Sequence, residues 1–500
     1  MLSSKQWTLV ASILASSLTF IDGTAVNVAL PALQAHLGAT ITDVQWVIEA
    51  YTLLYGSLIL VGGSIGDQLG RKRVFLVGVY LFAIASILCG LAPTPELLIA
   101  ARAFQGVGAA LLAPGSLALV SAAFDDKERG RAIGTWSGVS AITTAIGPVL
   151  GGWLIEHWSW RAVFFLNVPL AIIVVWLSVL HVDESRDPER SGALDWLGAA
   201  LTVVGLSGLV YGLLTWPALG GGHLRTSGAI AIGVFALVVF LLVERRVANP
   251  MLPLGLFKIS AFSLTNLLTF LLYGALSTML FVVPLVMIQV GGYTATEAGA
   301  SLLPFTVILF LMSRWAGGLV DRVGHRIPLT AGPAVAAVGL ALFGLLVHSR
   351  GGSYWLDFFL PMVVLATGMG ITVAPLTTTV MTAAGRTHAG VASGVNNAVA
   401  RIGGLVAIAM LGVVLARSFE SRVTPRLAQI SLSAESRQNV TRELPKMAGM
   451  KLDSIPALTP AERPAVHAAV DDSFVSAYRV VMLIVAGLSL AAALVGLAIA

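Results

Sequence analysis

Ionisable side chains are rare in the long apolar segments of this chain, so the few that occur there are the first candidates for chemistry. Asp22, Glu49 and Arg102 stand in apolar segments near the N-terminus, and Arg314 and Arg401 stand in later ones. A charge inside such a segment costs several kcal/mol in a membrane unless it is paired. Burial raises the pKa of a carboxyl and a nearby arginine lowers it, so a change in their separation binds or releases a proton.

Three of these groups are expected at a similar depth. With a helical rise of 1.5 Å per residue, Asp22, Glu49 and Arg102 lie about 8–12 Å below the outer ends of their segments. We expect Asp22 to be the main protonation site and Arg102 its partner. Glu49 is expected to carry a second proton or to bind a cationic substrate. The alternatives are a permanent Asp22–Arg102 pair, and a wetted, inert Glu49.

The two later arginines are expected to differ in role. Arg314 precedes the basic bend at 317–326 by a few residues, so its side chain is expected to extend towards that surface. Arg401 is expected near mid-depth, with Asn396 and Asn397 one turn earlier. A basic group at that depth could pair with an acidic substrate.

The composition predicts helices that cross a membrane. The chain has 500 residues, of which 57% are hydrophobic and 11% charged, whereas soluble domains carry about 25% charged residues. Apolar runs long enough to span a bilayer recur along nearly the whole chain. They predict an all-α integral membrane protein with 14 transmembrane helices, approximately at 8–30, 44–65, 73–92, 97–121, 132–155, 162–181, 193–215, 226–243, 261–284, 298–318, 328–348, 355–380, 391–416 and 475–499.

The distribution of Lys and Arg predicts the orientation. Bends on the side of the N-terminus carry most of these residues, and the short opposite bends carry only Arg161, Arg225 and Arg350. Basic loops remain in the cytoplasm, so both termini are expected there, in the cell (inner or plasma) membrane. The hydrophilic stretch 417–473 is then an outer loop, either a short hairpin that covers an exit or an irregular loop.

Several classes of function are disfavoured. The net charge of +5 is explained by cytoplasmic loops, so no nucleic-acid partner is expected. Cys89 is the one cysteine, so disulfides and Cys-ligated metals within the chain are excluded. The sequence has no GxxxxGK[ST] loop, so ATP is not the expected energy source. Without a nucleophile–base or metal constellation, we expect neither an enzyme nor a cofactor, and a proton gradient as the energy source.

A charged, glycine-rich bend occurs twice. The first copy is "GGSIGDQLGRKR" at 62–73 and the second is "GGLVDRVGHR" at 317–326. The copies lie eight predicted helices apart, which favours two six-helix bundles (1–185 and 259–500) separated by two extra helices (186–258). Glycines permit close helix approach, and the acidic group can pair with a base or cap a helix. We expect a conformational latch formed by Gly63, Asp67, Gly70, Arg71, Arg73, Asp321 and Arg322.

Further stretches give the chain a family resemblance. "GGSIGDQLGRKR" resembles the signature loop of the major facilitator superfamily, and "LIAARAFQGVGAA" (98–110) resembles its fourth-helix arginine motif. "LTFIDGTAVNVALP" (18–31) is similar to the first-helix motif of the fourteen-helix drug:proton antiporters, and "WRAVFFLNVP" and "GVASGVNNAVARIGG" fit the same family. The resemblance implies proton-driven export of lipophilic, often cationic compounds by alternating access.

The fifth predicted helix carries a glycine pattern of its own. "GVSAITTAIGPVLGG" (138–152) resembles the antiporter motif of exporters, with Gly138, Gly147, Pro148, Gly151 and Gly152. The spacing 147/151 permits close helix packing, and Pro148 permits a bend. The resemblance places this packing at the interface of the two halves, where it limits leak. Generic tight packing is the alternative.

The resemblance also indicates where a substrate would bind. The candidate substrate-binding residues are Glu49, Tyr51, Tyr55, Trp136, Asn396 and Arg401. The expected partners are a small-molecule substrate, protons and the lipid bilayer, and an accessory export protein is left open. The alternative functions are proton-coupled export of one endogenous metabolite or lipid-like molecule, and a non-transporting receptor on a transporter fold.

Overall fold

The chain is almost entirely helical. The computed structural model describes residues 3–186, 195–247, 250, 252–317, 319–349, 352–384 and 389–499. Those ranges contain no strand, and they include 13 helices long and apolar enough to cross a membrane. The expected segment 132–155 lies in a further helix of 32 residues, α5 (Asp126–His157). The prediction of an all-α membrane protein is confirmed, and the arrangement is consistent with fourteen spans.

The helices follow one another with short connections. The first seven are α1 (Ser4–Leu37), α2 (Ile41–Leu69), α3 (Arg71–Leu91), α4 (Pro95–Ala123), α5, α6 (Trp160–Phe165) and α7 (Asn167–His181). Next come α8 (Trp196–Leu219) and α9 (Leu224–Glu244), then a 3₁₀ turn (Leu254–Lys258). The remainder are α10 (Ser260–Gln289), α11 (Ala295–Ala300), α12 (Leu303–Gly317), α13 (Leu319–Val323), α14 (Arg326–Leu346), a π-helical turn (Trp355–Phe359), α15 (Leu360–Ala384), α16 (Ala389–Ala428), α17 (Ala434–Glu443), two 3₁₀ turns (Leu444–Gly449 and Leu452–Ser454) and α18 (Arg463–Leu497).

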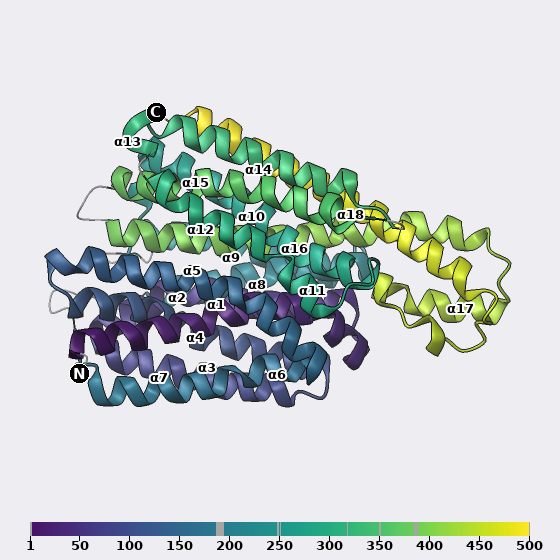
Figure 1. The fold of residues 1–500 in the computed structure, drawn as a ribbon, viewed down its shortest axis with the longest axis horizontal. Helices are drawn as coiled ribbons and strands as arrows, with labels where there is room; N and C mark the ends of the chain where they lie inside the picture. The colour runs from purple at the N-terminus through teal and green to yellow at the C-terminus, as the bar shows by residue number, and fades with distance from the viewer. Residues whose placement is uncertain are drawn as a thin grey trace.

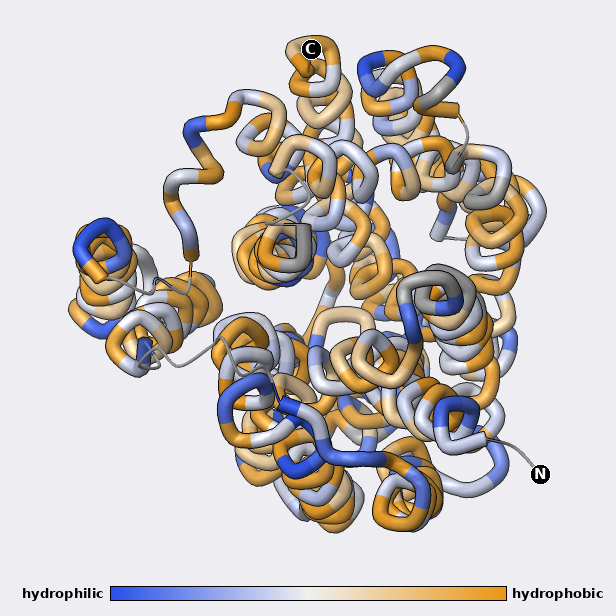
Figure 2. The backbone as a smooth tube through the Cα atoms, turned by 90° about the vertical axis from the view of Figure 1, so that its left-hand side faces the viewer, coloured by the Kyte–Doolittle hydropathy of each residue, from blue (hydrophilic) through white to orange (hydrophobic). Residues whose placement is uncertain are grey.

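The helices form two groups and a side pair. We call α1–α7 the first half and α10–α18 the second half; they lie one above the other in Figure 1. Both termini lie at one end of the molecule, the terminal end, and α17 projects from the other, the hairpin end (Figure 1). Helices α8 and α9 pack mainly on each other, beside the two halves (Figure 2). Glycines at their contact, such as Gly205, Gly208 and Gly233, allow the two backbones to approach closely.

The repeated glycine-rich bend has a glycine with positive φ in both halves. Gly70 has φ 116° and Gly324 has φ 75°, a region that side chains other than glycine rarely adopt. Each glycine lies between a helix and its successor, α2 and α3 in one half and α13 and α14 in the other. Both glycines aligned from the sequence therefore follow the end of a helix with positive φ.

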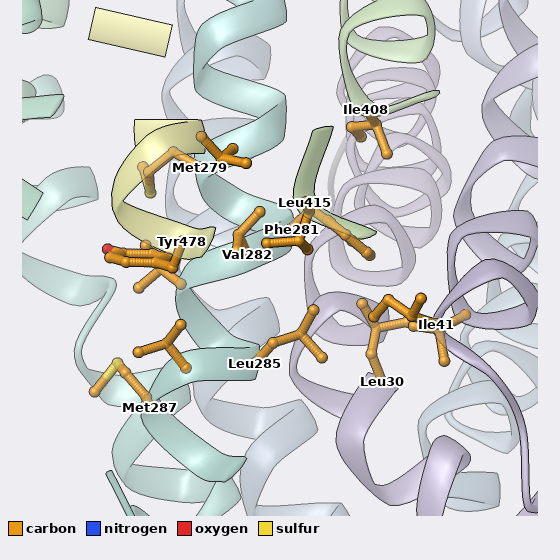
Figure 3. Packing of buried hydrophobic residues seen from close by; sticks show 14 of the residues in the cluster. Leu30, Ile41, Met279, Phe281, Val282, Leu285, Met287, Ile408, Leu415 and Tyr478 are labelled. Atoms are coloured by element: carbon orange, nitrogen blue, oxygen red, sulfur yellow. The ribbon is translucent and has the colours of Figure 1, made fainter. Parts of the chain in front are cut away.

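The largest apolar cluster joins the two halves towards the hairpin end. Leu30 of α1 and Ile41 of α2 lie close to Leu285 of α10 and Leu415 of α16 (Figure 3). Two other clusters remain within one half, one around Phe82 in the first half and one between α10, α15 and α16 in the second, whereas a smaller cluster joins α2, α8 and α16. The halves are therefore closed against each other at the hairpin end.

The hydrophilic stretch 417–473 is a helical hairpin rather than an irregular loop. Helix α16 continues to Ala428 and α18 already begins at Arg463, with α17 between them. Met447 and Ile455 of the connecting turns are buried in the cluster that joins the halves. The hairpin therefore packs on the protein surface where the two halves meet.

A short chain of hydrogen bonds attaches this hairpin to both halves. The side-chain amide of Gln34, in α1, donates to the carbonyl of Lys446 at 2.9 Å. The amide of Gln289, at the end of α10, donates to the Gln34 Oε1 at 2.7 Å. Gly449 lies against both glutamines, with no room for a side chain. The hairpin thus covers the junction of α1 and α10.

Candidate functional site

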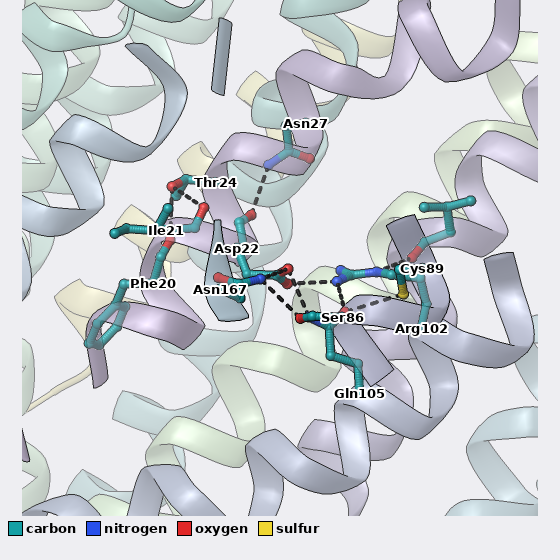
Figure 4. A network of polar contacts seen from close by, with 12 residues as sticks. Phe20, Ile21, Asp22, Thr24, Asn27, Ser86, Cys89, Arg102, Gln105 and Asn167 are labelled. Carbon is teal, nitrogen blue, oxygen red and sulfur yellow. Dashed lines mark hydrogen bonds and ion pairs between the residues drawn. The ribbon is translucent and has the colours of Figure 1, made fainter. Parts of the chain in front are cut away.

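The predicted carboxylate and arginine form a buried ion pair between α1 and α4. Arg102 Nη1 lies 2.6 Å from Asp22 Oδ2, and neither side chain is more than 2% exposed. The other oxygen of Asp22 accepts hydrogen bonds from Gln105 Nε2 at 2.9 Å and from Asn167 Nδ2 at 3.2 Å (Figure 4). Two neutral amides and one guanidinium therefore surround a single carboxylate.

Polar groups of four helices complete this network. Gln105 and Asn167 also donate to the Ser86 hydroxyl of α3, at 2.8 and 3.1 Å. Arg102 donates through Nη1 to Gln105 Oε1 at 2.6 Å and through Nε to the Val47 carbonyl of α2 at 3.0 Å. Sequence reasoning found Asp22 and Arg102 but assigned no role to Ser86, Gln105 and Asn167. The spacing of Arg102 and Gln105, three residues apart on one helix face, was the available signal.

Two tyrosines connect Arg102 to the second half. The guanidinium carbon of Arg102 lies 4.2 Å from the centre of the Tyr51 ring, and the Tyr51 and Tyr55 rings are 5.6 Å apart. The guanidinium carbon of Arg401, in α16, lies 3.6 Å from the Tyr55 ring centre. These four residues form an Arg–Tyr–Tyr–Arg row that crosses from α4 through α2 to α16. Such cation–π contacts contribute roughly 2 kcal/mol each when shielded from water.

Glu49 lies outside this network. Its side chain is fully buried, and neither carboxyl oxygen has a hydrogen-bond partner among the described residues. On α2 it shares a face with Gln45 and Leu53, four residues before and after. Gln45 donates to the carbonyl of Ile408 in α16 at 3.3 Å, and Leu53 packs in a cluster with α8 and α16. Glu49 therefore faces the α2–α16 seam, on the side of α2 away from Arg102.

The other substrate candidates lie on both halves. Trp136, in α5, donates to the hydroxyl of Ser16 in α1 at 3.0 Å. Asn396, in α16, donates to the side chains of Asn266 and Thr269 in α10, at 3.2 and 2.7 Å. Sequence reasoning did not assign Asn266 and Thr269, since neutral polar residues in an apolar helix often bond to their own backbone.

A small cavity opens beside Asn396. Its volume is ≈ 90 Å³, and it lies between α10, α15 and α16. Its polar lining residues are Tyr273, Thr377, Ser393, Asn396 and Asn397. The cavity therefore presents hydroxyls and amides, without a charged group, on the second half.

The predicted latch residues of the first half pair locally. Arg71 Nε lies 2.8 Å from Asp67 Oδ1, one helical turn apart at the junction of α2 and α3. Gly63 is in ordinary contact with Pro114 of α4, whereas a side chain on the neighbouring Gly62 would meet the Ala110 carbonyl. Gly62, together with Gly106 of α4, which lies against the Tyr51 carbonyl, therefore permits the close approach of α2 and α4. The latch between halves stays a prediction.

A carboxylate that sequence reasoning missed holds the start of α3. Glu184 accepts hydrogen bonds from the backbone N–H groups of Lys72 at 3.0 Å and Arg73 at 3.3 Å. Its Oε2 also lies 3.7 Å from Arg73 Nε, and its carboxyl carbon lies against Gly70. A carboxylate at a helix N-terminus is stabilising because the free N–H groups there carry partial positive charge.

The second copy of the bend is only partly described. Asp321 belongs to α13 and Arg314 to α12, but their side chains lie outside the described part of the chain. Arg322 lies in the last turn of α13 and is exposed. The proposed partners of these residues therefore stay predictions.

The glycines of α5 press against the helix that carries Asp22. A side chain on Gly147 would meet the Thr24 hydroxyl, and one on Gly151 would lie 2.7 Å from the Ala25 side chain. Both contacts fall on the turn of α1 that follows Asp22. Gly138 lies earlier in α5. The tight packing expected from the glycine spacing is present here.

The same stretch of α5 also meets the second half. A side chain on Gly152 would overlap the carbonyl of Ala295 in α11, and one on Gly299 would overlap the carbonyl of Pro148. The two helices therefore approach each other by small residues on both sides. The contact lies at the hairpin end, where α5 ends and α11 begins.

The fold and the site together define a membrane transporter of two helical halves with a buried ion pair in one of them. The family model described as "Major Facilitator Superfamily" matches residues 12–408. The chain belongs to the major facilitator superfamily.

Its relatives are drug-resistance exporters of that family. The chain is 35% identical over 421 residues to the "Multidrug resistance protein Stp" of Mycobacterium tuberculosis, covering 84% of this chain and 78% of the relative. It is 31% identical to the "Tetracenomycin C resistance and export protein" of Streptomyces glaucescens, covering 99% and 92%. A bacterial homologue of the human lysosomal transporter Spinster superposes with a TM-score of 0.67 at 16% identity, covering 100% and 98%.

Proposed function

We propose that this chain is a proton-coupled antiporter that exports lipophilic compounds, cations among them, by alternating access. The Asp22–Arg102 pair and its amide donors support this proposal most directly. Gln105 and Asn167 give Asp22 hydrogen bonds that do not depend on Arg102. Asp22 can therefore gain or lose a proton while its side chain stays in place.

The packing around Asp22 provides a route from proton binding to movement. A proton on Asp22 weakens its attraction to Arg102, so α1 and α4 are free to shift. Gly147 and Gly151 of α5 rest on the same part of α1, and Gly152 rests on α11 of the second half. A shift of α1 is therefore transmitted through α5 to the contact between the halves.

The remaining assignments follow from this scheme. The terminal end is proposed to face the cytoplasm, in the cell membrane, and the six-helix bundles are 1–185 and 259–500 around the linker helices of 186–258. The buried carboxyl of Glu49, which has no hydrogen-bond partner among the described residues, is proposed as the anchor for a cationic compound or a second proton. The bends at Asp67 and Asp321 are proposed as latches at the cytoplasmic face.

The proposal is tested in inside-out vesicles with an imposed proton gradient. Ethidium accumulation is compared between wild type, Asp22→Asn and the control Asp453→Asn, whose carboxylate is 91% exposed on the hairpin. We expect gradient-driven accumulation in wild type and control, and none in Asp22→Asn. The Asp22→Asn protein should still exchange labelled for unlabelled ethidium without a gradient, which shows that it is folded. Gradient-driven accumulation by Asp22→Asn at the wild-type rate would contradict the assignment.

A further inference from the structure

Arg401 is a cation without an anion. Among the described residues no carboxylate pairs with it, and its Nε has no hydrogen-bond partner although it is buried. The face of Tyr55 is its described contact. An arginine stays protonated in proteins, so this charge is permanent. Arg102 has the same type of aromatic contact but also pairs with Asp22.

Glu49, the buried carboxyl on the same helix as Tyr55, does not form an ion pair with Arg401 in the described part of the chain. Gly56 of α2 touches the Arg401 side chain, and Glu49 lies seven residues before Gly56 on the same helix. Two helical turns separate the two positions by roughly 10 Å along α2. Glu49 and Arg401 are therefore two separate charges at the contact between α2 and α16, about two helical turns apart.

The cavity beside Asn396 lies one helical turn from Arg401, which is not among the described residues that line it. Asn397, one turn earlier on the same face of α16, and its neighbour Ala400 line the cavity of ≈ 90 Å³. A flat guanidinium binds carboxylate and phenolate oxygens through paired N–H groups, and its stack on Tyr55 fixes the plane in which they point. Amides and hydroxyls beside it can bond the rest of a polar group.

We propose that Arg401, stacked on Tyr55 and next to the amide-lined cavity, binds the acidic group of a second class of exported compound, lipophilic acids. This inference rests on the proposed export function and extends its substrate range. The acid and the cation then use different anchors, Arg401 and Glu49, so one change can remove transport of either without removing the other.

Two dyes with the same ring system and opposite charge provide the test. Rhodamine 123 is a lipophilic cation and fluorescein an acid, and both are followed in inside-out vesicles with a proton gradient. We expect wild type to move both. Arg401→Gln should lower fluorescein transport by about tenfold or more, the loss expected when a charge-assisted contact is removed, and leave rhodamine 123 within about twofold. Arg401→Lys should keep part of the fluorescein transport, because it retains the charge but not the planar donors.

The outcomes separate this inference from the export function itself. Wild-type transport of rhodamine 123 without any transport of fluorescein would overturn the acid site and leave proton-coupled export intact. An equal loss of both dyes in Arg401→Gln would show that Arg401 supports the structure and would also overturn the site. If wild type moved neither dye, the export function and the acid site would fail together. Glu49→Gln is the reciprocal variant and should affect rhodamine 123 alone.

Discussion

Arg102→Met should destabilise the protein more than the double variant Asp22→Asn/Arg102→Met, in which both charges of the buried pair are absent. In Arg102→Met the Asp22 carboxylate keeps only the amide donors of Gln105 and Asn167. Breaking a buried pair from one side costs about 3–5 kcal/mol. In Asp22→Asn the guanidinium still has the Gln105 and Val47 oxygens at 2.6 and 3.0 Å, so we expect a loss of about 2 kcal/mol.

The double variant Asp22→Asn/Arg102→Met contains neither buried charge. Replacing a buried ion pair by neutral groups is often nearly neutral, so we expect it to be more stable than Arg102→Met alone. The loss in the double variant should therefore be well below the roughly 5–7 kcal/mol that the two single losses would give by addition, and the difference is the coupling energy of the pair.

The chain contains its own reporter for this cycle. Cys89 is the single cysteine, it is fully buried, and its sulfur lies 3.7 Å from Gln105 Oε1 beside the ion pair. A dye that becomes fluorescent on reaction with thiols labels it only when this region opens, so thermal unfolding in detergent is read directly. Strict additivity of the two single variants would refute the view that Asp22 and Arg102 form one energetic unit.

Three further changes test other parts of the structure. Gly152→Leu places a side chain on the α11 backbone, so transport should be lost and stability should fall by about 1–3 kcal/mol, as measured by dye transport and thermal unfolding; normal transport would show that this contact is loose. Glu184→Ala removes the acceptor at the start of α3 and should cost about 1 kcal/mol, read from the same unfolding curve; an unchanged curve would show that α3 does not depend on this contact. Gln34→Leu removes the bond to the Lys446 carbonyl, so hydrogen exchange of 444–458 should become faster without a change elsewhere; unchanged exchange there would show that apolar packing alone holds the hairpin.

The depth of the charged groups in the membrane was predictable from the sequence, but the helix face on which each group lies relative to its neighbours was not. A rise per residue places Asp22 and Arg102 at one level, and the structure brings them to 2.6 Å. The same estimate placed Glu49 with them, yet it lies on another face of α2. That face follows from helix periodicity once the neighbours of α2 are known. A single sequence does not give those neighbours, because α2 contacts α4, α8 and α16, which are distant from one another in sequence.

Neutral polar groups were the main omission. Gln105, Asn167 and Ser86 complete the Asp22 site, but an amide or hydroxyl in a span does not demand a partner as strongly as a charge does. The sequence did not distinguish a hairpin from an irregular loop at 417–473 for a related reason. Its apolar residues, such as Met447 and Ile455, pack against helices distant in sequence, so they show no periodicity of their own.

The side pair α8–α9 has a consequence for how compounds reach the protein from the lipid. Helix α8 packs Leu206 and Val210 against Leu53 of α2 and Leu405 of α16, so it fills the groove between the halves on that flank. On the same flank α2 and α16 also touch nearer the terminal end, where Leu60 lies 3.0 Å from the position a side chain on Gly394 would take. A compound in the lipid beside this flank therefore meets packed helices rather than an opening between the halves.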